Sequence, residues 1–266
     1  MRRSLPATAL LALVLAPATL AAPAAPAAGA APDYAAWNQL LERYYDPAKG
    51  MDYKALKARD KAALDQLKRQ LAAVDPGALS RPDQLAYWIN LYNVNVVATV
   101  VDNYPVDSIR DISTDPIVRL NVFKKDTVAT RAGRISLNDV ENDRIRAAFK
   151  DPRIHFAINC AAASCPPIRP EAYVGSRVDA QLDDQTRKFL NGPHGVRLTR
   201  KGDTLRVYTT KIMDWFGEDF DEWGGGRLPF LRKYLTPERQ KTLAAAGGKV
   251  ELEYQDYSWD LNDWKR

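Results

Sequence analysis

Residues 80–103 read SRPDQLAYWINLYNVNVVATVVDN, and the rest of the chain is organised around this stretch. Ser80 is suited to cap a helix, and Pro82 falls in the first turn, where its missing N–H has no intrahelical partner to lose. From residue 83 onwards the sequence is apolar on nearly every face of a helix, which is typical of a fully buried element. It therefore predicts a buried helix over residues 83–103 at the centre of the fold.

Amphipathic helices and alternating strands are predicted around this central helix. A Lys201-Gly202-Asp203 turn between two alternating segments indicates a β-hairpin. Interspersed helices and mostly hairpin strands give the fold class α+β, a single domain with a buried central helix and a mainly antiparallel sheet flanked by helices. The expected helices are two within 34–74, then 136–149, 176–190, 226–234 and 237–246. The expected strands are 154–159, 196–199, 204–209 and 249–254, with the first three in one sheet.

The N-terminal residues indicate export. Arg2 and Arg3 precede an apolar segment that gives way to Ala and Pro, which is the pattern of a signal peptide over residues 1–21. The apolar run is interrupted by proline and is shorter than the roughly 20 residues that a bilayer span requires. Residues 22–33 form an Ala/Pro-rich flexible lead-in, and 34–266 form the single domain. We expect a secreted or periplasmic protein with no membrane span in the mature chain.

The charge pattern argues against nucleic acid as a partner. The formal net charge is only +5, and the basic residues Arg197, Arg200, Lys201 and Arg206 fall in the predicted hairpin, where they form a solvated face. Acidic residues between 214 and 222 lack the ligand spacing of a calcium loop, so neither a metal nor a cofactor is predicted. The expected partner is an unknown small-molecule or protein ligand.

Reactive residue types are concentrated in RIHFAINCAAASCPP, residues 153–167, which holds both cysteines and one of the two histidines. A cysteine thiolate attacks acyl groups when a neighbouring imidazole takes its proton and a carboxylate or carboxamide orients the ring. Cys165, His155 and either Glu141 or Asn159 supply these types, so they are the candidate catalytic residues.

The predicted strand decides between the two cysteines. Alternation along residues 154–159 places His155 and Cys160 on opposite faces, whereas Cys165 lies beyond the strand end on a loop. Loops are where substrates reach catalytic groups, so Cys165 is the preferred nucleophile. The enzyme predicted in this way is a thiol-dependent acyl hydrolase or transferase.

A disulfide is the alternative, and the sequence favours it. In an exported protein, Cys160 and Cys165 meet an oxidising compartment where such pairs are usually joined. The bond would stabilise the fold by about 2 kcal/mol and fix the loop of a ligand- or protein-binding scaffold domain. His155 would then be a hydrogen-bonded core residue. A redox-active disulfide is a third interpretation, and the sequence leaves open whether the protein is an enzyme.

Four ordered blocks resemble the domain of unknown function 547 family over residues 86–262. The resemblance implies no activity, because the family has none assigned. Many of its members carry a histidine directly after the glutamate that corresponds to Glu141, whereas Asn142 stands here. The blocks are AYWINLYN (86–93), DPRIHFAINCAAASCPPIRPEAY (151–173), KIMDWFGEDF (211–220) and YSWDLN (257–262).

The first and third blocks contain the candidate ligand-binding residues Asn90, Asn93, Lys211 and Trp215. Asn90 and Asn93 are three positions apart and share one helix face. A buried carboxamide without partners costs about 1–3 kcal/mol, so both must form hydrogen bonds. They either anchor adjacent loops or line a binding site.

Overall fold

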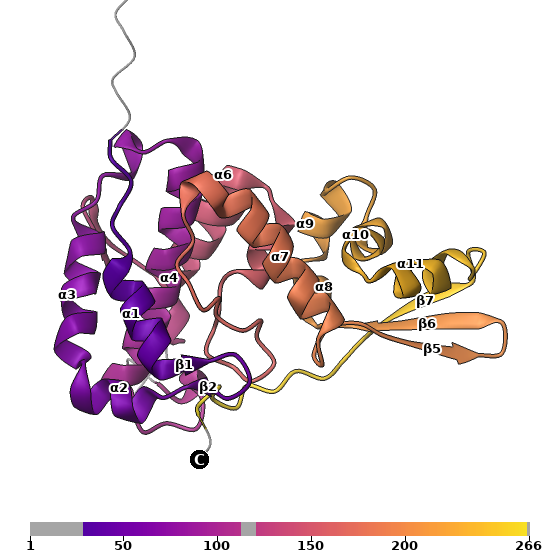
Figure 1. Cartoon of the computed structure of the whole chain (residues 1–266), viewed down its shortest axis with the longest axis horizontal. Helices are drawn as coiled ribbons and strands as arrows, with labels where there is room; N and C mark the ends of the chain where they lie inside the picture. Colours follow the sequence, from indigo (N-terminus) through magenta and orange to yellow (C-terminus); the bar gives the residue numbers. More distant parts are fainter. Residues whose placement is uncertain (1–28, 113–120, 265–266) are drawn as a thin grey trace, which may run out of the picture.

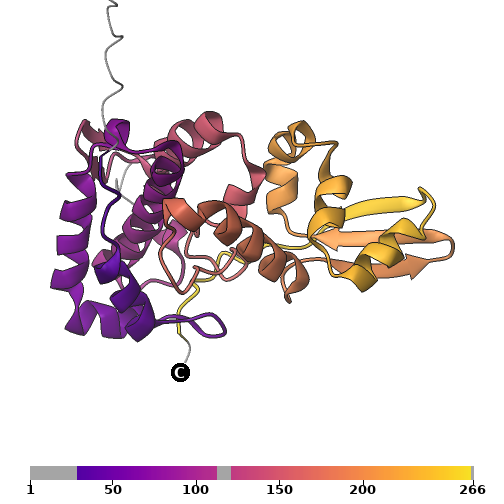
Figure 2. The same cartoon turned by 45° about the horizontal axis from the view of Figure 1, so that its top comes forward.

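The computed structural model describes residues 29–112 and 121–264. The predicted signal peptide and most of the predicted lead-in lie outside these residues. A large helical lobe contains the N-terminal half of the domain, and a smaller lobe contains a three-stranded sheet and the last helices (Figures 1 and 2). None of the helices described within 29–112 and 121–264 has both the length and the hydrophobicity of a membrane span.

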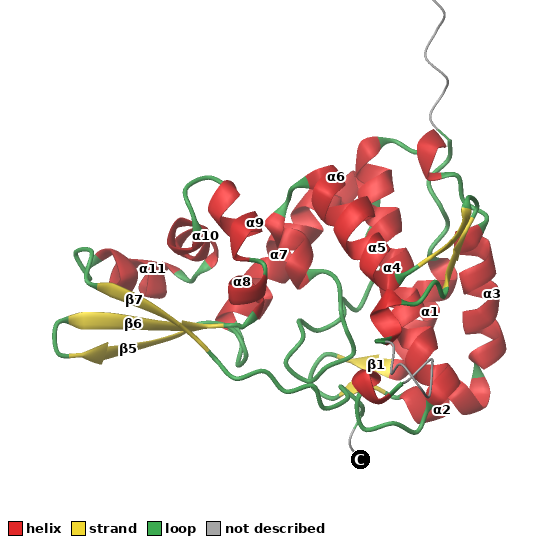
Figure 3. Cartoon of the chain, turned by 180° about the vertical axis from the view of Figure 1, so that it is seen from behind, coloured by secondary structure: helices red, strands yellow, loops and turns green. Residues whose placement is uncertain are grey.

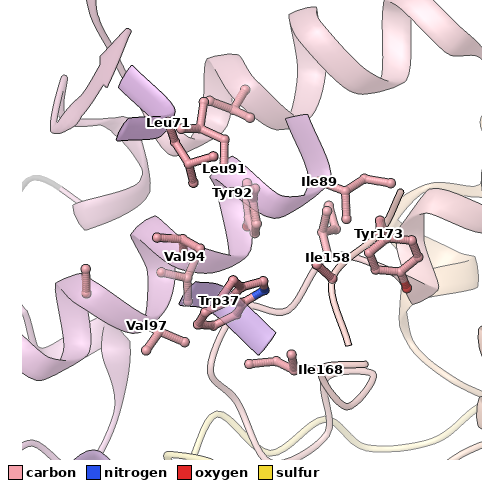
Figure 4. Packing of buried hydrophobic residues seen from close by; sticks show 14 of the residues in the cluster. Trp37, Leu71, Ile89, Leu91, Tyr92, Val94, Val97, Ile158, Ile168 and Tyr173 are labelled. Carbon is pink, nitrogen blue, oxygen red and sulfur yellow. The ribbon is translucent and has the colours of Figure 1, made fainter. Parts of the chain in front are cut away.

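The large lobe is built around α4 (Arg81–Asn103), which confirms the predicted central helix. Ser80 Oγ accepts a hydrogen bond from the Asp83 N–H at 3.3 Å, so the helix begins at the expected cap. Trp37 lies beside Val94 and Val97 of α4 in the core (Figure 4). Three helices rather than the predicted two pack around α4 from the N-terminal side: α1 (Ala35–Tyr44), α2 (Tyr53–Arg59) and α3 (Lys61–Ala72).

The sheets are small and mixed. The predicted hairpin is confirmed as β5 (Arg197–Lys201) and β6 (Thr204–Thr209), which pair antiparallel with Arg197 opposite Tyr208. The predicted last strand is confirmed as β7 (Val250–Tyr254), but it pairs with β6 in parallel. Two short antiparallel hairpins complete the strands: β1 (Tyr45–Asp46) with β2 (Gly50–Met51), and β3 (Val128–Thr130) with β4 (Gly133–Ile135).

One helix joins the two lobes into a single α+β domain. On α7 (Val178–Asn191), Leu182 packs into the core around α4, whereas Phe189 packs into a second core beneath the three-stranded sheet. That second core is covered by α8 (Ile212–Trp215), α9 (Gly217–Glu222), α10 (Arg227–Tyr234) and α11 (Pro237–Ala244). Because one helix contributes to both cores, the lobes share packing and are not independent units.

The predicted strand over residues 154–159 is wrong. The chain forms a 3₁₀-helix, η5 (Pro152–Phe156), whose start is capped by the Asp151 side chain on the Arg153 N–H. The Ile154 N–H bonds to the Asp151 carbonyl at 3.2 Å, so the backbone satisfies its hydrogen bonds locally and pairs with no described strand. A short apolar run fits a buried helical turn as well as a strand, and the Asp-Pro start decides in favour of the turn.

The predicted helix over residues 136–149 is present but irregular. The capping box at Ser136 opens α5 (Leu137–Asp139), which continues as the π-helix η4 (Val140–Arg146) and then as α6 (Ala147–Phe149). A π-helix places one extra residue in each turn, so side chains after residue 140 face directions that a regular helix does not give them. Glu141 lies in this segment.

Buried carboxamides on α4 hold the cysteine-containing segment in place. Asn93 Nδ2 donates to the Ala157 carbonyl at 3.0 Å, and Asn93 Oδ1 accepts from the Asn159 N–H at 2.9 Å. Asn90 binds the backbone of Tyr173 in the same two-sided way, at 2.7 and 3.0 Å. The two asparagines therefore anchor the chain on either side of the segment that carries the cysteines.

Replacing Asn93 by alanine is expected to lower the free energy of unfolding by about 2–4 kcal/mol, because it strands two buried backbone groups at about 1–3 kcal/mol each. Urea denaturation measures the change. Asn103→Ala is the matched control, since Asn103 lies on the same helix but is exposed and bonds only to the Thr99 carbonyl; its expected change is within about 0.5 kcal/mol. Equal losses in both variants would contradict an anchoring role for Asn93.

Candidate functional site

A cavity of about 240 Å³ lies where the π-helix, the cysteine segment, α8 and the C-terminal segment meet. The C-terminal segment reaches it by running back from β7 towards β1 (Figure 3). Most of the wall is aromatic or aliphatic, and the lining also includes one carboxyl group, one imidazole, two thiols and two tyrosine hydroxyls. The lining residues that matter below are Tyr92, Glu141, His155, Cys160, Cys165, Trp215, Phe216, Tyr257 and Trp259.

The two cysteines are in contact. Their sulfurs are 2.9 Å apart, longer than the roughly 2.05 Å of a disulfide bond, and both are free thiols. The Cys160 N–H donates to Cys165 Sγ at 3.0 Å, and the Tyr257 hydroxyl lies 3.2 Å from Cys160 Sγ. Ala161 between them has φ of 62°, a left-handed conformation that costs roughly 1–2 kcal/mol for a residue with a Cβ. This turn folds the backbone around the sulfurs.

The two thiols differ in pKa and in solvent exposure because their surroundings differ. Hydrogen bonds from Cys165, from Tyr257 and from the Ala162 N–H lower the pKa of Cys160 against the opposing effect of burial. Burial raises the pKa of Cys165 well above its ordinary value, and the neighbouring Cys160 raises it further. Cys165 is also only 8% exposed, whereas Cys160 is partly exposed towards the cavity. The geometry therefore favours Cys160 as the more reactive thiol. Sequence analysis had favoured Cys165 because of its expected position on a loop.

Glu141 is a carboxyl group that titrates near neutral pH. Its side chain faces the cavity from the π-helix and accepts a hydrogen bond from the Tyr92 hydroxyl at 3.3 Å. Burial raises the pKa of Glu141 to about 7, although Arg146 and Tyr92 act in the opposite direction. A carboxyl with this pKa can both donate and accept a proton at pH 7.

His155 is oriented by Asp219, which sequence analysis missed. His155 Nε2 lies 2.6 Å from Asp219 Oδ2, and Arg146 binds both oxygens of the same carboxylate at 2.7 and 2.9 Å. Burial lowers the pKa of His155. Burial acts to raise the pKa of Asp219, but hydrogen bonds from His155 and Arg146 outweigh it and hold the pKa of Asp219 well below its usual range. The imidazole is then neutral, with its proton on Nε2 facing the carboxylate and its lone pair on Nδ1. The ring stacks on Phe216 at 4.1 Å.

The side chain of Asn159 is buried in hydrogen bonds to the protein and does not line the cavity. Its Nδ2 donates to the Pro166 carbonyl at 2.7 Å, and its Oδ1 accepts from the Ala161 N–H at 2.8 Å and from Asn262 at 3.2 Å. Asn159 thus closes the cysteine loop on itself and ties it to the C-terminal segment. The carboxylate that contacts the His155 ring belongs to Asp219, whereas Asn159 bonds to the backbone of its own loop and to Asn262.

The four predicted ligand-binding residues divide into three environments. Trp215 lines the cavity, is 46% exposed and packs against Tyr257 at a ring-centroid distance of 4.8 Å. Asn90 and Asn93 anchor backbone, as described above. Lys211 forms an ion pair with Asp214 at 2.7 Å and is not among the residues that line the cavity. Of this set, Trp215 is the one that a ligand in the cavity would touch.

Residues 76–190 match the sequence profile of the family described as "Protein of unknown function, DUF547". This segment of the chain is therefore similar to DUF547. No curated protein and no solved structure is significantly similar to this chain.

The matched DUF547 segment supplies one part of the cavity, and later residues supply the other. Glu141, His155 and the two cysteines lie inside residues 76–190. Asp219 and the aromatic residues Trp215 and Tyr257 follow the segment, so the resemblance of the last two sequence blocks to the family is not covered by the match. In residues 29–112 and 121–264, no three His, Cys, Asp or Glu side chains are arranged to hold a metal ion.

Proposed function

We propose that this protein is a thiol-dependent acyl hydrolase or transferase with Cys160 as its nucleophile. One observation carries the proposal: Cys160, Glu141 and His155 face the same cavity. A thiol of lowered pKa, a carboxyl group of pKa about 7 and an oriented imidazole of lowered pKa thereby line one cavity. Perturbed titrating groups concentrated in a cavity are characteristic of active sites.

The electrostatic interaction between Cys160 and Glu141 supports different protonation states for the two groups. The charge of Glu141 raises the pKa of the Cys160 thiol, so the cavity favours a single negative charge shared between them. In the reactive form Cys160 is the thiolate and Glu141 is the neutral acid. Cys165 then donates its S–H to the thiolate, because an ionised Cys160 has no proton to give.

The reaction follows from these protonation states. Cys160 Sγ attacks the carbonyl carbon of an ester or thioester, the bond to the leaving group breaks, and the leaving group takes the proton of Glu141. The ionised Glu141 then removes a proton from water or from an acceptor alcohol or amine, which attacks the thioester and releases Cys160 as thiolate. Each turnover returns both groups to their starting protonation states.

The wall of the cavity favours an apolar acyl group. Trp215, Phe216, Tyr257 and Trp259 contribute aromatic surface beside the sulfurs. Burying such surface contributes about 25 cal/mol per Å², so a longer acyl chain should bind more tightly.

The signal-peptide pattern of residues 1–21 supports the further proposal that the enzyme acts outside the cytoplasm, in the periplasm or as a secreted protein.

A second candidate function rests on the contact between the sulfurs. If the thiols are joined after export, the domain has no nucleophile and the cavity serves as the binding site of a scaffold domain for a small-molecule or protein ligand. The separation of 2.9 Å is short enough for oxidation to form the bond with small adjustment.

Thiol counting and ester turnover separate the two candidates. Protein purified from its native compartment is denatured without reductant and treated with a thiol reagent. Separately, the reduced protein is incubated with p-nitrophenyl acetate and p-nitrophenyl hexanoate, and acyl-enzyme is sought by intact mass. We expect two free thiols, a mass increase by one acyl group at Cys160 and faster release from the hexanoate. Zero free thiols in the native protein, or no acylation of the reduced one, overturns the hydrolase.

A further inference from the structure

Cys165 has no role in the acyl-transfer scheme beyond a hydrogen bond, yet it is the best placed group in the molecule to react with Cys160. Its sulfur is 2.9 Å from Cys160 Sγ, and the Cys160 N–H holds it at 3.0 Å. Backbone bonds from the Ala163 N–H to the Asp260 carbonyl at 2.7 Å fix the loop that connects the two cysteines. Disulfide formation therefore requires no unfolding of the loop.

The two cysteines also differ in the cavities that they line. Both cysteines line the 240 Å³ cavity, and Cys165 in addition lines a second cavity of about 630 Å³ on its other side. The second cavity is bounded by the β1–β2 hairpin, the end of α7 and the C-terminal segment, and it carries Lys49, Lys188 and His194. A molecule in the second cavity therefore meets Cys165 without entering the first cavity, whose wall contains both cysteines.

We propose that the Cys160 and Cys165 pair reduces apolar organic hydroperoxides, with Cys160 as the attacking thiol and Cys165 as the thiol that resolves it. The occupant of the first cavity is a hydroperoxide with a hydrocarbon or aromatic body, which suits the wall of Trp215, Phe216, Tyr257 and Trp259. This activity needs no acyl substrate, so it goes beyond the proposed hydrolase.

The chemistry balances with the groups present. Cys160 thiolate attacks the terminal peroxide oxygen, which keeps its hydrogen, so the O–O bond breaks and Cys160 becomes a sulfenic acid. The alkoxide that leaves takes the proton of neutral Glu141 in the same cavity and departs as the alcohol. Glu141 regains a proton when the reduced Cys160 ionises again. Cys165 Sγ attacks Cys160 Sγ, its proton leaves with the hydroxyl group as water, and the disulfide forms. A dithiol reductant then attacks Cys165 from the second cavity and, by thiol–disulfide exchange, leaves as its own disulfide while both cysteines return to thiols.

The apolar wall of the first cavity, rather than the reactivity of the thiol, determines which hydroperoxide is preferred. Hydrogen peroxide gains nothing from an apolar wall, whereas a cumyl group removes aromatic surface from water. Burial of a few carbon groups at about 0.8 kcal/mol each corresponds to a rate preference of about tenfold or more for cumene hydroperoxide.

The test uses the full reduced chain with one equivalent of cumene hydroperoxide or hydrogen peroxide. We expect cumyl alcohol in equal amount, a loss of about 2 Da from the protein as two thiols become a disulfide, and faster reaction with the organic peroxide. Repeated turnover is expected when dithiothreitol is present. Oxidation no faster than that of free cysteine, or an equal rate with both peroxides, overturns the proposal.

Two variants assign the roles of the sulfurs. In Cys165→Ser the sulfenic acid has no partner and is trapped on Cys160 by dimedone, with no loss of 2 Da. In Cys160→Ser the rapid reaction is lost. Cys165→Ala, checked for unchanged circular dichroism, repeats the trapping experiment if the serine variant folds poorly. Dimedone labelling of Cys165 in Cys160→Ser at the wild-type rate overturns the assignment. Ester acylation of Cys160 in Cys165→Ser is read separately, so either activity can fail without the other.

Discussion

Replacing Cys160 by serine is expected to lower kcat/KM for p-nitrophenyl hexanoate by about a thousandfold or more, because the hydroxyl group that replaces the thiolate stays protonated at neutral pH. The same substitution at Cys165 should leave the acyl-enzyme detectable, with a rate that falls less. Cys165 supplies one hydrogen bond to the thiolate, and Tyr257 and the Ala162 N–H supply others. Stopped-flow release of p-nitrophenol and intact mass measure both variants.

This pair of variants is its own control, since each removes one sulfur from the same loop. If Cys165→Ser were the inactive variant and Cys160→Ser kept its acyl-enzyme, the assignment of the nucleophile would be reversed. Loss of both activities with unchanged thermal stability would indicate that the two sulfurs act as a unit.

Glu141→Gln is expected to have opposite effects on activity and stability. The amide cannot exchange a proton, so kcat should fall by about 10²–10⁴-fold. The limb of the pH profile of kcat/KM on which the rate declines as pH rises through about 7 should disappear, because that limb reports the loss of the neutral acid. Tyr92→Phe, which removes the hydroxyl bonded to Glu141, should retain the limb and move it to higher pH.

The stability of the same variant depends on pH with a definite sign. The pKa of Glu141 is about 7 in the folded chain, against 4.5 for an ordinary glutamate side chain, so the folded state binds the extra proton between these two pH values. The wild type therefore loses stability relative to Glu141→Gln as pH rises through this window. The difference should reach about 3 kcal/mol above pH 8 and vanish below pH 4. Urea unfolding at pH 4 and pH 8 measures it, and a difference that does not change with pH contradicts the buried, raised pKa.

The central helix was predictable because its determinants are local. A capping serine, a proline in the first turn and an unbroken apolar sequence specify α4 without reference to any other segment. The hairpin of β5 and β6 followed for the same reason, from a Gly-containing turn between two alternating runs. Glu141 was among the candidate catalytic residues because of its residue type, although nothing in the sequence spacing signals the π-helix that carries it.

The interior of the site was less accessible to sequence reasoning because it depends on contacts between distant residues. Asp219 reaches His155 from 64 positions away and belongs to an acidic run that resembles a solvated surface. Tyr257 reaches Cys160 from 97 positions away. The order of the two cysteines in acidity and exposure follows from these partners and from the 3₁₀-helix that replaced the expected strand, so no local pattern could have supplied it.

The path of the C-terminal segment determines when the thiol site can form. The loop of Cys160 and Cys165 is closed by backbone bonds to residues 258 and 260 and by Asn262, and its hydroxyl partner is Tyr257. During synthesis the cysteines leave the ribosome long before these residues exist, so the chain passes through a period in which both thiols are present without their acidity or their enclosure. The thiol site is therefore complete only after the C-terminal residues have been made, and a chain interrupted before residue 257 carries the cysteines but not the site.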